Sequence, residues 1–318
     1  MTSIGKREAA WTVKLGQPQR RQFFFSFSEQ NIEPKDHISL LSQYGLVAPY
    51  LVPKQEDLAS PTLRHPDLHQ SNIFLRPQST DILGIIDWQG ASILPFFLQS
   101  GFPVFCDHDP ERPQTLEKPK LGDNFEEMNP GEQEEALMSL KHKQANLYYT
   151  AATGLKCERH MRALRLPYLN MRQYLINQAG MPWDGDLVNL RAALIGVHSQ
   201  WDDLVGERAC PISFTDEEVR SATQESREWN EAAEVLTTIR STLGIDGEGG
   251  TDPENHNRAA ALNKEWRIQM LTEAKPEEKQ RCWQIWPFKD DSESARTCKI
   301  TNCSNMPVLP KLQQRQLT

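Results

Sequence analysis

The sequence has few cysteines, and none of them falls in a metal-binding or disulfide-rich pattern. Six cysteines occur in 318 residues, at positions Cys106, Cys157, Cys210, Cys282, Cys298 and Cys303. No C-x-x-C pair is repeated and no secretory signal precedes them, so we expect reduced thiols and no secreted disulfide framework. Cys298 and Cys303, with His256 as a distant third ligand, have the wrong spacing and number for a structural zinc site.

Long apolar runs and an excess of positive charge are also missing. No stretch approaches the ~20 apolar residues that span a membrane, so we expect a soluble protein. The 35 Lys and Arg residues are outnumbered by 43 Asp and Glu, which gives a formal net charge of −8. This balance argues against general binding to nucleic acids or anionic membranes. The first 21 residues contain Glu8 and no apolar core, so a surface helix fits them better than a mitochondrial presequence.

Helical patterns dominate a chain that is long enough for one large or two ordinary domains. We expect early helices at the N-terminus and near Asp36–Tyr44, on either side of the aromatic run Phe23-Phe24-Phe25. Apolar stripes predict later helices through Leu137–Ala151, Leu187–Leu204, Thr215–Gly244 with Thr215 and Glu218 as caps, and Asn257–Ala274. We interpret the stripes as core. Residues 95–130 are expected to form a long ordered loop, and residues 289–318 a flexible tail.

One polar motif surrounds a predicted β-hairpin. The apolar runs Ile73–Leu75 and Ile82–Ile86 are separated by a polar turn, which is typical of two short antiparallel strands. His65-Pro66-Asp67 and Asn72 precede the first run as H-x-D-x-x-x-x-N, and Asp87 follows the second run, 15 residues after Asn72. Because a hairpin folds its two outer ends together, we expect Asn72 and Asp87 to lie at the same end.

These residue types suit phosphoryl transfer. The reaction needs metal ions that bridge the phosphates, and a carboxylate that orients the accepting hydroxyl and takes its proton. In this interpretation Asp67 is the catalytic carboxylate, while Asn72 and Asp87 hold Mg²⁺ through the oxygen ligands that it prefers. The alternative is that Asp67 and Asn72 are helix-cap or turn residues and Asp87 is a charge at a strand end.

The segment resembles the catalytic loop of the aminoglycoside phosphotransferase and choline kinase families, which are relatives of the protein kinases. Their loop reads H-G-D-L-H-x-x-N and their second motif D-W or D-F, and this chain has His65-Pro66-Asp67-Leu68-His69-Gln70-Ser71-Asn72 and Asp87-Trp88. From about Trp11 to Asp290, the chain resembles most closely the fungal altered-inheritance-of-mitochondria phosphotransferase-like proteins.

The resemblance implies an α+β, mostly α fold: the C-terminal lobe of a protein-kinase-like fold with a helical extension, over residues 1–288. It implies ATP and Mg²⁺ as cofactors, Asp67 as the catalytic base, Asn72 and Asp87 as metal ligands, and His65 as the residue that orients the loop. The acceptor would be the hydroxyl of a small molecule. The implied compartment is the mitochondrion, and without the resemblance we expect the cytoplasm.

Two features depart from the family pattern. Pro66 replaces the usual Gly, which fixes φ and removes a backbone N–H. The 64 residues before His65 contain no G-x-G-x-x-G loop, and Lys14 matches the ATP-binding lysine poorly, so we expect the nucleotide-holding lobe to be missing from this chain. A second hypothesis is therefore an inactive, pseudokinase-like interaction module or a truncated product, with a protein partner covering the exposed face.

Acidic residues gather in the segment Cys106–Glu135, at positions Asp107, Asp109, Glu111, Asp123, Glu126 and Glu127. Carboxylates in this part of the resembled families recruit cationic substrates. A solvated acidic loop explains the same residues, and we favour it because charge runs are usually surface. The same holds for Asp184 and Asp186 in Trp183-Asp184-Gly185-Asp186.

Overall fold

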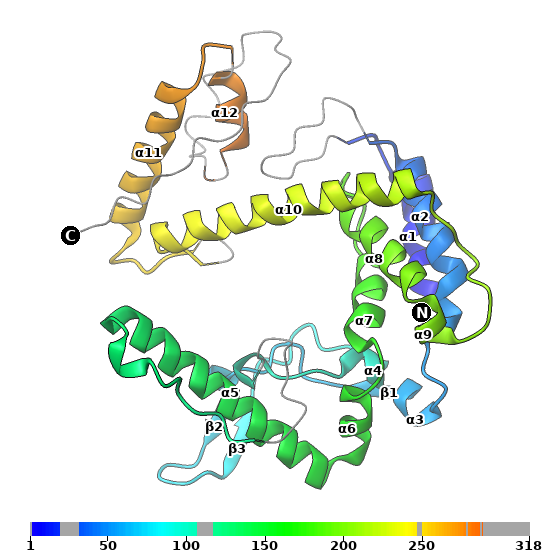
Figure 1. Ribbon diagram of the computed structural model, residues 1–318, viewed down its shortest axis with the longest axis horizontal. Helices are drawn as coiled ribbons and strands as arrows, with labels where there is room; N and C mark the ends of the chain where they lie inside the picture. Colours follow the sequence, from blue (N-terminus) through cyan, green and yellow to red (C-terminus); the bar gives the residue numbers. More distant parts are fainter. Residues whose placement is uncertain are drawn as a thin grey trace. The chain divides into compact units, whose positions relative to one another are not determined.

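The computed structural model describes residues 2–19, 32–106, 117–246, 250–277, 279–286 and 288. The described chain is mostly helical, and its named strands all fall within residues 61–95 (Figure 1). The prediction of an α+β, mostly α fold is therefore confirmed. Among the described residues, no helix combines the length and the apolar character needed to cross a membrane.

The chain divides into two units. Unit 1 comprises Met1–Lys14, Ile38–Pro182 and Ala193–Phe214, and unit 2 comprises Leu15–His37, Trp183–Ala192 and Thr215–Thr318. The helices assigned mainly to unit 1 are α1 (Thr2–Leu15), α2 (Pro34–Val47), α3 (Glu56–Ala59), α4 (Phe96–Gln99), α5 (Pro130–Lys156), α6 (Glu158–Leu164), α7 (Leu169–Gln178) and α9 (Trp201–Val205). Helix α8 (Val188–Ser199) has residues in both units.

The strands of unit 1 form two separate antiparallel pairs. Strands β2 (Ile73–Leu75) and β3 (Ile82–Ile85) pair with Ile73 opposite Ile85, and the register shifts between Phe74 and Leu75. This is the predicted hairpin. A second pair joins β1 (Pro61–Leu63) to β4 (Ile93–Pro95), with Leu63 opposite Ile93. We did not predict this pair, because strands of three residues leave little periodicity in a sequence.

Fully buried apolar side chains hold the helical part of unit 1 together. They come from α2, α3, α4, α7, α8 and the 3-10 turn η1 (Ala48–Leu51), and include Tyr44, Val47, Leu51, Leu58, Phe97, Leu175, Leu194 and Val197. A Cβ on Gly5 would lie 2.7 Å from the Tyr44 ring, so glycine is what lets α1 approach α2. Burial raises the pKa of Tyr44 to about 12.

Helix α5 corrects one prediction about the core. It begins with a capping box in which Asn129 and Glu132 bond each other's backbone N–H groups. The predicted apolar stripe is present, yet Leu137 is 41% exposed and Tyr148 is 61% exposed. In α5 only Asn146 and Thr153 are buried, because its packing comes from α6 and two 3-10 turns, η3 (Val104–Cys106) and η4 (Phe125–Glu127).

Two further predictions need adjustment. The single helix expected through Leu187–Leu204 is broken at Gln200, whose φ of −107° and ψ of 18° separate α8 from α9. The loop expected over residues 95–130 contains α4, η3 and η4, because Phe97 and Cys106 are buried and order this part of the chain. Sequence periodicity does not detect such short elements.

Unit 2 is built around α10 (Asp216–Leu243). Its first turn has the predicted capping box of Thr215 and Glu218, and it ends at Gly244, whose φ of 68° is left-handed. Arg191 forms an ion pair of 3.2 Å with Glu225 of α10. Helices α11 (His256–Glu273) and α12 (Lys279–Ile285) follow, and α11 lies one residue from the predicted helix Asn257–Ala274.

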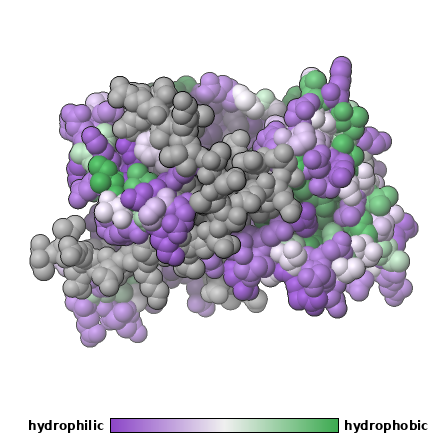
Figure 2. Space-filling model, turned by 90° about the horizontal axis from the view of Figure 1, so that it is seen from above, coloured by the Kyte–Doolittle hydropathy of each residue, from purple (hydrophilic) through white to green (hydrophobic). Residues whose placement is uncertain are grey.

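Among the coloured residues on the face shown in Figure 2, hydrophilic side chains predominate, and hydrophobic ones form separate patches. This agrees with a sequence in which 25% of the residues are charged. Several predictions lie outside the described residues. These are the aromatic run Phe23-Phe24-Phe25, the tail 289–318 with Cys298 and Cys303, and the acidic residues Asp107, Asp109 and Glu111.

Candidate functional site

His65 joins the two halves of the predicted motif. Its Nε2 lies 2.7 Å from the carbonyl oxygen of Ile86, and its Nδ1 accepts the backbone N–H of Asp67 at 3.2 Å. Since Nδ1 accepts, Nε2 carries the proton, and its N–H donates a hydrogen bond to the Ile86 carbonyl oxygen. The ring is 6% exposed and meets Trp88 edge to face, with centroids 4.8 Å apart. His65 therefore ties the loop of Asp67 to the residue before Asp87.

Asn72 makes a second connection between the same segments. It ends the 3-10 turn η2 (Gln70–Asn72), is 6% exposed, and its Nδ2 donates to the carbonyl oxygen of Asp67 at 2.9 Å. Its own carbonyl oxygen accepts the N–H of Ile86 at 3.0 Å. Because Nδ2 is engaged with Asp67, the amide Oδ1 is the side-chain atom left to coordinate a cation.

Asp87 has an unusual backbone conformation at the end of β3. Its φ is 63°, which lies in the left-handed region that non-glycine residues rarely adopt. Asp87 is exposed, so burial does not force this conformation. Residues held in sparsely populated backbone regions gather at active sites and ligand clamps. Gln78 and Tyr168 also have a left-handed φ, so the conformation agrees with a functional role of Asp87 and is not specific to it.

The loop contains a further pair of polar residues to which the motif analysis gave no role. His69 Nε2 lies 3.1 Å from Oδ2 of Asp67, and His69 Nδ1 lies 2.7 Å from Oγ of Ser71. The signal in the sequence was the position of His69, two residues after Asp67 and inside the quoted motif. Contacts between side chains two residues apart depend on the loop conformation, which the sequence pattern does not specify.

Asn72 and Asp87 fit a magnesium ion. In the described part of the chain, no three His, Cys, Asp or Glu side chains are grouped as a metal site. Mg²⁺ does not need such a cage, because it is usually held by one or two carboxylates with waters and substrate phosphates. An amide oxygen and a carboxylate are hard donors, and the bond from Ile86 N–H to the Asn72 carbonyl keeps their backbones adjacent.

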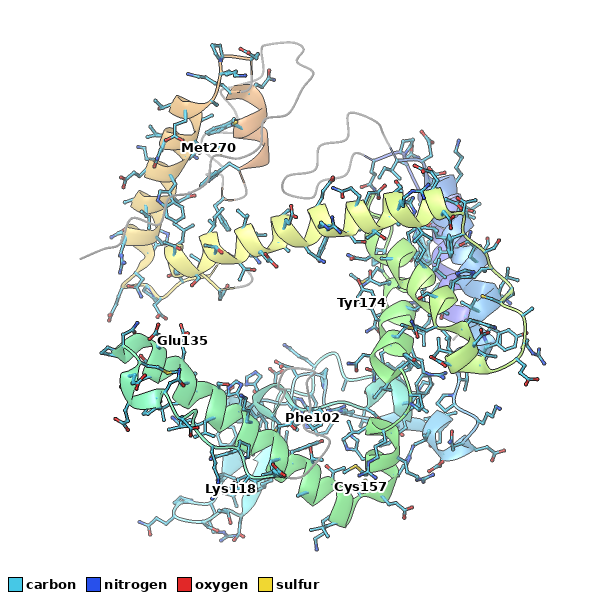
Figure 3. All side chains as sticks on the ribbon, viewed as in Figure 1. Phe102, Lys118, Glu135, Cys157, Tyr174 and Met270 are labelled. Carbon is cyan, nitrogen blue, oxygen red and sulfur yellow. The ribbon has the colours of Figure 1, made fainter. Side chains whose placement is uncertain are left out.

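Arg64 fixes the chain just before His65. Its guanidinium donates to the carbonyl oxygens of Gln99 and of Gly101, the latter at 3.0 Å. Burial lowers its pKa, and the negative form of Tyr149 opposes this shift. Burial also lowers the pKa of His160, as does the positive charge of Arg64. The rings of His160 and Phe102 both contact the Tyr149 ring. Phe102 is labelled in Figure 3, as is Cys157, the residue between α5 and α6.

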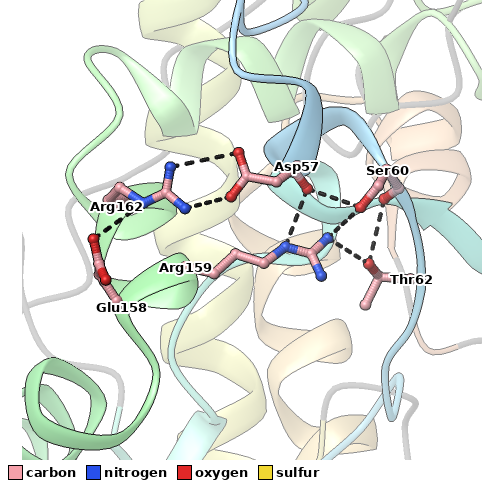
Figure 4. A network of polar contacts seen from close by, with 6 residues as sticks. All are labelled: Asp57, Ser60, Thr62, Glu158, Arg159 and Arg162. Atoms are coloured by element: carbon pink, nitrogen blue, oxygen red, sulfur yellow. Dashed lines mark hydrogen bonds and ion pairs between the residues drawn. The ribbon is translucent and has the colours of Figure 1, made fainter.

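Arg159 of α6 fixes the chain that leads into β1. Figure 4 shows its guanidinium among three oxygens, at 3.0 Å from the Asp57 carbonyl, 2.6 Å from Ser60 Oγ and 3.0 Å from Thr62 Oγ1. The same guanidinium lies 3.9 Å from the Phe96 ring centroid. Next to it, Arg162 pairs with the Asp57 carboxylate. Helix α6 thus sets the position of β1, which precedes the motif by one residue.

The other predicted candidates are exposed side chains or local caps. Lys14 is an exposed residue of α1, and Asp123, Glu126 and Glu127 are exposed in and beside η4. In unit 2, Asp184 and Asp186 accept backbone N–H groups, of Asp186 and Val188 respectively, both at 2.8 Å. These two aspartates cap local backbone N–H groups, a role that the prediction of a solvated acidic segment did not include.

Comparison with known proteins finds fungal relatives. The chain is 46% identical over 297 residues to a subtelomeric hrmA-associated cluster protein of Aspergillus fumigatus, in two strains, and this match covers 93% of the chain but 58% of the relative. The chain thus spans little more than half the length of these curated relatives. No family model matches the sequence, and no solved structure matches it either.

More distant relatives are named altered inheritance of mitochondria protein 9, mitochondrial. The protein from Kluyveromyces lactis is 25% identical over 198 residues, or 58% of this chain and 31% of the relative. The protein from Saccharomyces cerevisiae is 22% identical over 222 residues, or 66% of this chain and 35% of the relative. The predicted similarity to altered-inheritance-of-mitochondria proteins is confirmed as a distant, partial one, shorter than the span Trp11–Asp290 that we expected.

Proposed function

We propose that this chain contains the catalytic and metal-holding half of an ATP-dependent phosphotransferase with a protein-kinase-like fold. One observation supports the proposal: hydrogen bonds of His65 and Asn72 hold the backbones of Asp67 and of Ile86, the residue before Asp87, next to each other.

In the proposed reaction, Asp67 receives the proton of an acceptor hydroxyl. The Asp67 side chain is 60% exposed, so an acceptor can reach it, while His65 and Asn72 hold its backbone in place. Mg²⁺ held by Asn72 and Asp87 would offset the negative charge of the ATP phosphates. The acceptor class that we propose is the hydroxyl of a small molecule.

The relatives support a place of action. The altered inheritance of mitochondria proteins carry the word mitochondrial in their names. We therefore propose the mitochondrion as the compartment of this chain.

Thermal unfolding with nucleotide tests the proposal. Millimolar MgATP should raise the melting temperature more than magnesium tripolyphosphate does, since a ligand at 100 times its Kd stabilises the folded state by about 2.7 kcal/mol. Asn72→Ala and Asp87→Ala should remove the Mg²⁺-dependent part. Asp81→Ala is the matched control, because Asp81 is an exposed carboxylate in the turn of the same hairpin. Equal shifts with MgATP and tripolyphosphate would contradict nucleotide binding by this chain.

An exposed apolar surface favours a second function, that of an inactive interaction module. In the β2–β3 hairpin, Phe74 is 52% exposed, Leu75 51%, Ile82 60% and Leu83 59%, and Ile86 after it is 50% exposed. Apolar side chains that remain this exposed on a soluble protein are candidates for an interaction site. The occupant that we propose is a nucleotide-holding lobe. The match covers 58% of the Aspergillus fumigatus relative, and the residues outside the match could form such a lobe.

Association in solution separates the two functions. If the hairpin surface binds another protein segment, the full chain should form oligomers or aggregates at micromolar concentration, and Ile82→Lys with Leu83→Lys should return it to a monomer in light scattering. If the unaltered chain is already a monomer, and the double variant leaves its nucleotide binding unchanged, the hairpin has no covering role. Retained MgATP binding would argue against the inactive module.

A further inference from the structure

Three polar side chains alternate along the catalytic loop and contact one another in a row. Asp67 Oδ2 lies 3.1 Å from His69 Nε2, and His69 Nδ1 lies 2.7 Å from Ser71 Oγ. Leu68 and Gln70 stand between them in the sequence. The row therefore lies along one side of the loop and includes the proposed base.

The chemistry of the three groups sets the direction of the hydrogen bonds. An ionised carboxylate only accepts, so Nε2 of His69 carries a proton, and its N–H donates a hydrogen bond to Asp67. In the neutral ring Nδ1 then accepts the Ser71 hydroxyl. Asn72 Nδ2 lies 3.4 Å from the same Nε2, but its shorter contact, of 2.9 Å, is with the Asp67 carbonyl oxygen. Ser71 thus helps to orient the ring that donates to Asp67.

We propose that His69 is a positioning residue, which holds one carboxylate oxygen of Asp67 so that the other faces the acceptor hydroxyl. This inference rests on the proposed function, because it deepens the role of Asp67. A free aspartate side chain rotates about two bonds, and a carboxylate bonded through Oδ2 loses most of that freedom. A base that keeps its orientation spends a larger fraction of time in the reactive geometry.

The exposure of the two side chains indicates that their contact orients Asp67 and contributes little to stability. The His69 and Asp67 side chains are 40% and 60% exposed. Exposed ion pairs and hydrogen bonds of this kind contribute between zero and about 1 kcal/mol to folding. Removing His69 should therefore leave the fold intact and change the geometry of Asp67. This separation makes the proposal testable.

The first test is independent of catalysis and uses the full chain labelled with ¹⁵N-histidine. The His69 signal is assigned by its loss in His69→Gln. If His69 Nε2 donates to Asp67, its chemical shift should move in Asp67→Ala and should not move in Asp81→Ala, the exposed control carboxylate. Equal shifts in the two variants would overturn the contact, and the proposal with it.

The second test measures ADP release from MgATP. His69→Ala should lower kcat about tenfold to a hundredfold and leave the KM for MgATP within about twofold of the original value, because small misplacements of a catalytic group cost this much. His69→Gln keeps a side-chain N–H and should recover most of the rate. His142→Ala, at an exposed histidine of α5, is the matched control and should behave like the unaltered chain.

The outcomes distinguish the two proposals. ADP release that is unchanged in His69→Ala contradicts the positioning role and leaves the proposed function standing. The absence of ADP release from the unaltered chain contradicts catalysis by this chain alone, and the histidine spectra then still decide whether His69 holds Asp67. Both proposals are supported if kcat falls in His69→Ala and recovers in His69→Gln, and if the chemical shift of His69 depends on Asp67.

Discussion

Two regions of unit 1 are held together by different forces. Between β1 and α4, polar side chains bond backbone carbonyls across the chain: His65 to Ile86, Asn72 to Asp67 and Gln99 to Thr62. In the helical core, apolar side chains such as Leu51 and Leu175 are fully buried. The site region is thus directed by hydrogen bonds, and the helical region is stabilised by apolar burial.

The difference separates function from stability. Hydrogen bonds depend on direction but contribute only about 0.5–1.5 kcal/mol each, whereas apolar burial has no direction and supplies most of the folding free energy. Substitutions in the site region should therefore change chemistry more than stability, and substitutions in the helical core should do the reverse. Each prediction below tests one side of this comparison.

The largest effect is expected at Asp67. Asp67→Asn removes the proton acceptor and keeps the shape, so ADP release from MgATP should fall by about 10²–10⁴-fold. The melting temperature should change by less than about 2 °C, because this side chain is 60% exposed. Parallel kinetic and calorimetric measurements check both statements. A large loss of stability would show that the site region also carries the fold.

The opposite pattern is expected at Leu175 in α7, which is 0% exposed. Leu175→Ala should lower the free energy of unfolding by about 2–5 kcal/mol through lost burial and a cavity. Urea unfolding measures this loss, and kcat per folded molecule should stay the same. Leu155→Ala is the matched control, since Leu155 is 82% exposed and should change stability by less than about 0.5 kcal/mol.

Arg159 of α6 bonds the chain that leads into β1 and so connects the helical region to the site region. Its replacement should affect the stability of one and the geometry of the other. Arg159→Ala removes the bonds to Asp57, Ser60 and Thr62 and should cost about 1–3 kcal/mol in urea unfolding. Arg162→Ala removes a pair whose side chains are 45% and 41% exposed, and should cost at most about 1 kcal/mol. Equal losses in the two variants would mean that the Arg159 network has no special weight.

The stability of unit 1 should fall in mild acid because of His160. Its pKa in the folded chain is lowered from the ordinary value of 6.5, first by burial and then by Arg64. Below pH 6.5 the unfolded chain therefore binds the proton more readily, and stability decreases until the pH passes the folded pKa. His160→Gln should flatten this slope in urea unfolding between pH 5 and 7.5. An unchanged slope would assign it to other groups.

The smallest change in stability is expected at Asp87, where a substitution should raise the free energy of unfolding. Glycine adopts the left-handed φ of 63° without strain, so Asp87→Gly should raise the free energy of unfolding by a few tenths to about 1 kcal/mol. The same variant should lose the Mg²⁺-dependent part of MgATP binding. Isothermal calorimetry and urea unfolding measure the two effects, and a stability loss would contradict strain at this position.

Features that depend on neighbouring residues were predictable from the sequence. The β2–β3 hairpin follows from two apolar runs around a polar turn, and the ends of α10 follow from the Thr215–Glu218 box and Gly244. The motif spacing also predicted that Asn72 and Asp87 would lie at the same end of the hairpin, and Ile86, the residue before Asp87, does bond the Asn72 carbonyl oxygen. The roles of Asp67, Asn72 and Asp87 in phosphoryl transfer stay predictions until nucleotide binding is measured.

Contacts between distant segments were decided only by the tertiary structure. The bond from His65 to Ile86, the clamp of Arg159 on Ser60 and the exposure of Leu137 all depend on how the chain folds back on itself. Periodicity reports which face of an element is apolar, but not which other element will cover that face. The residue types and spacing of the site were therefore determined by the sequence, and their orientation by the fold.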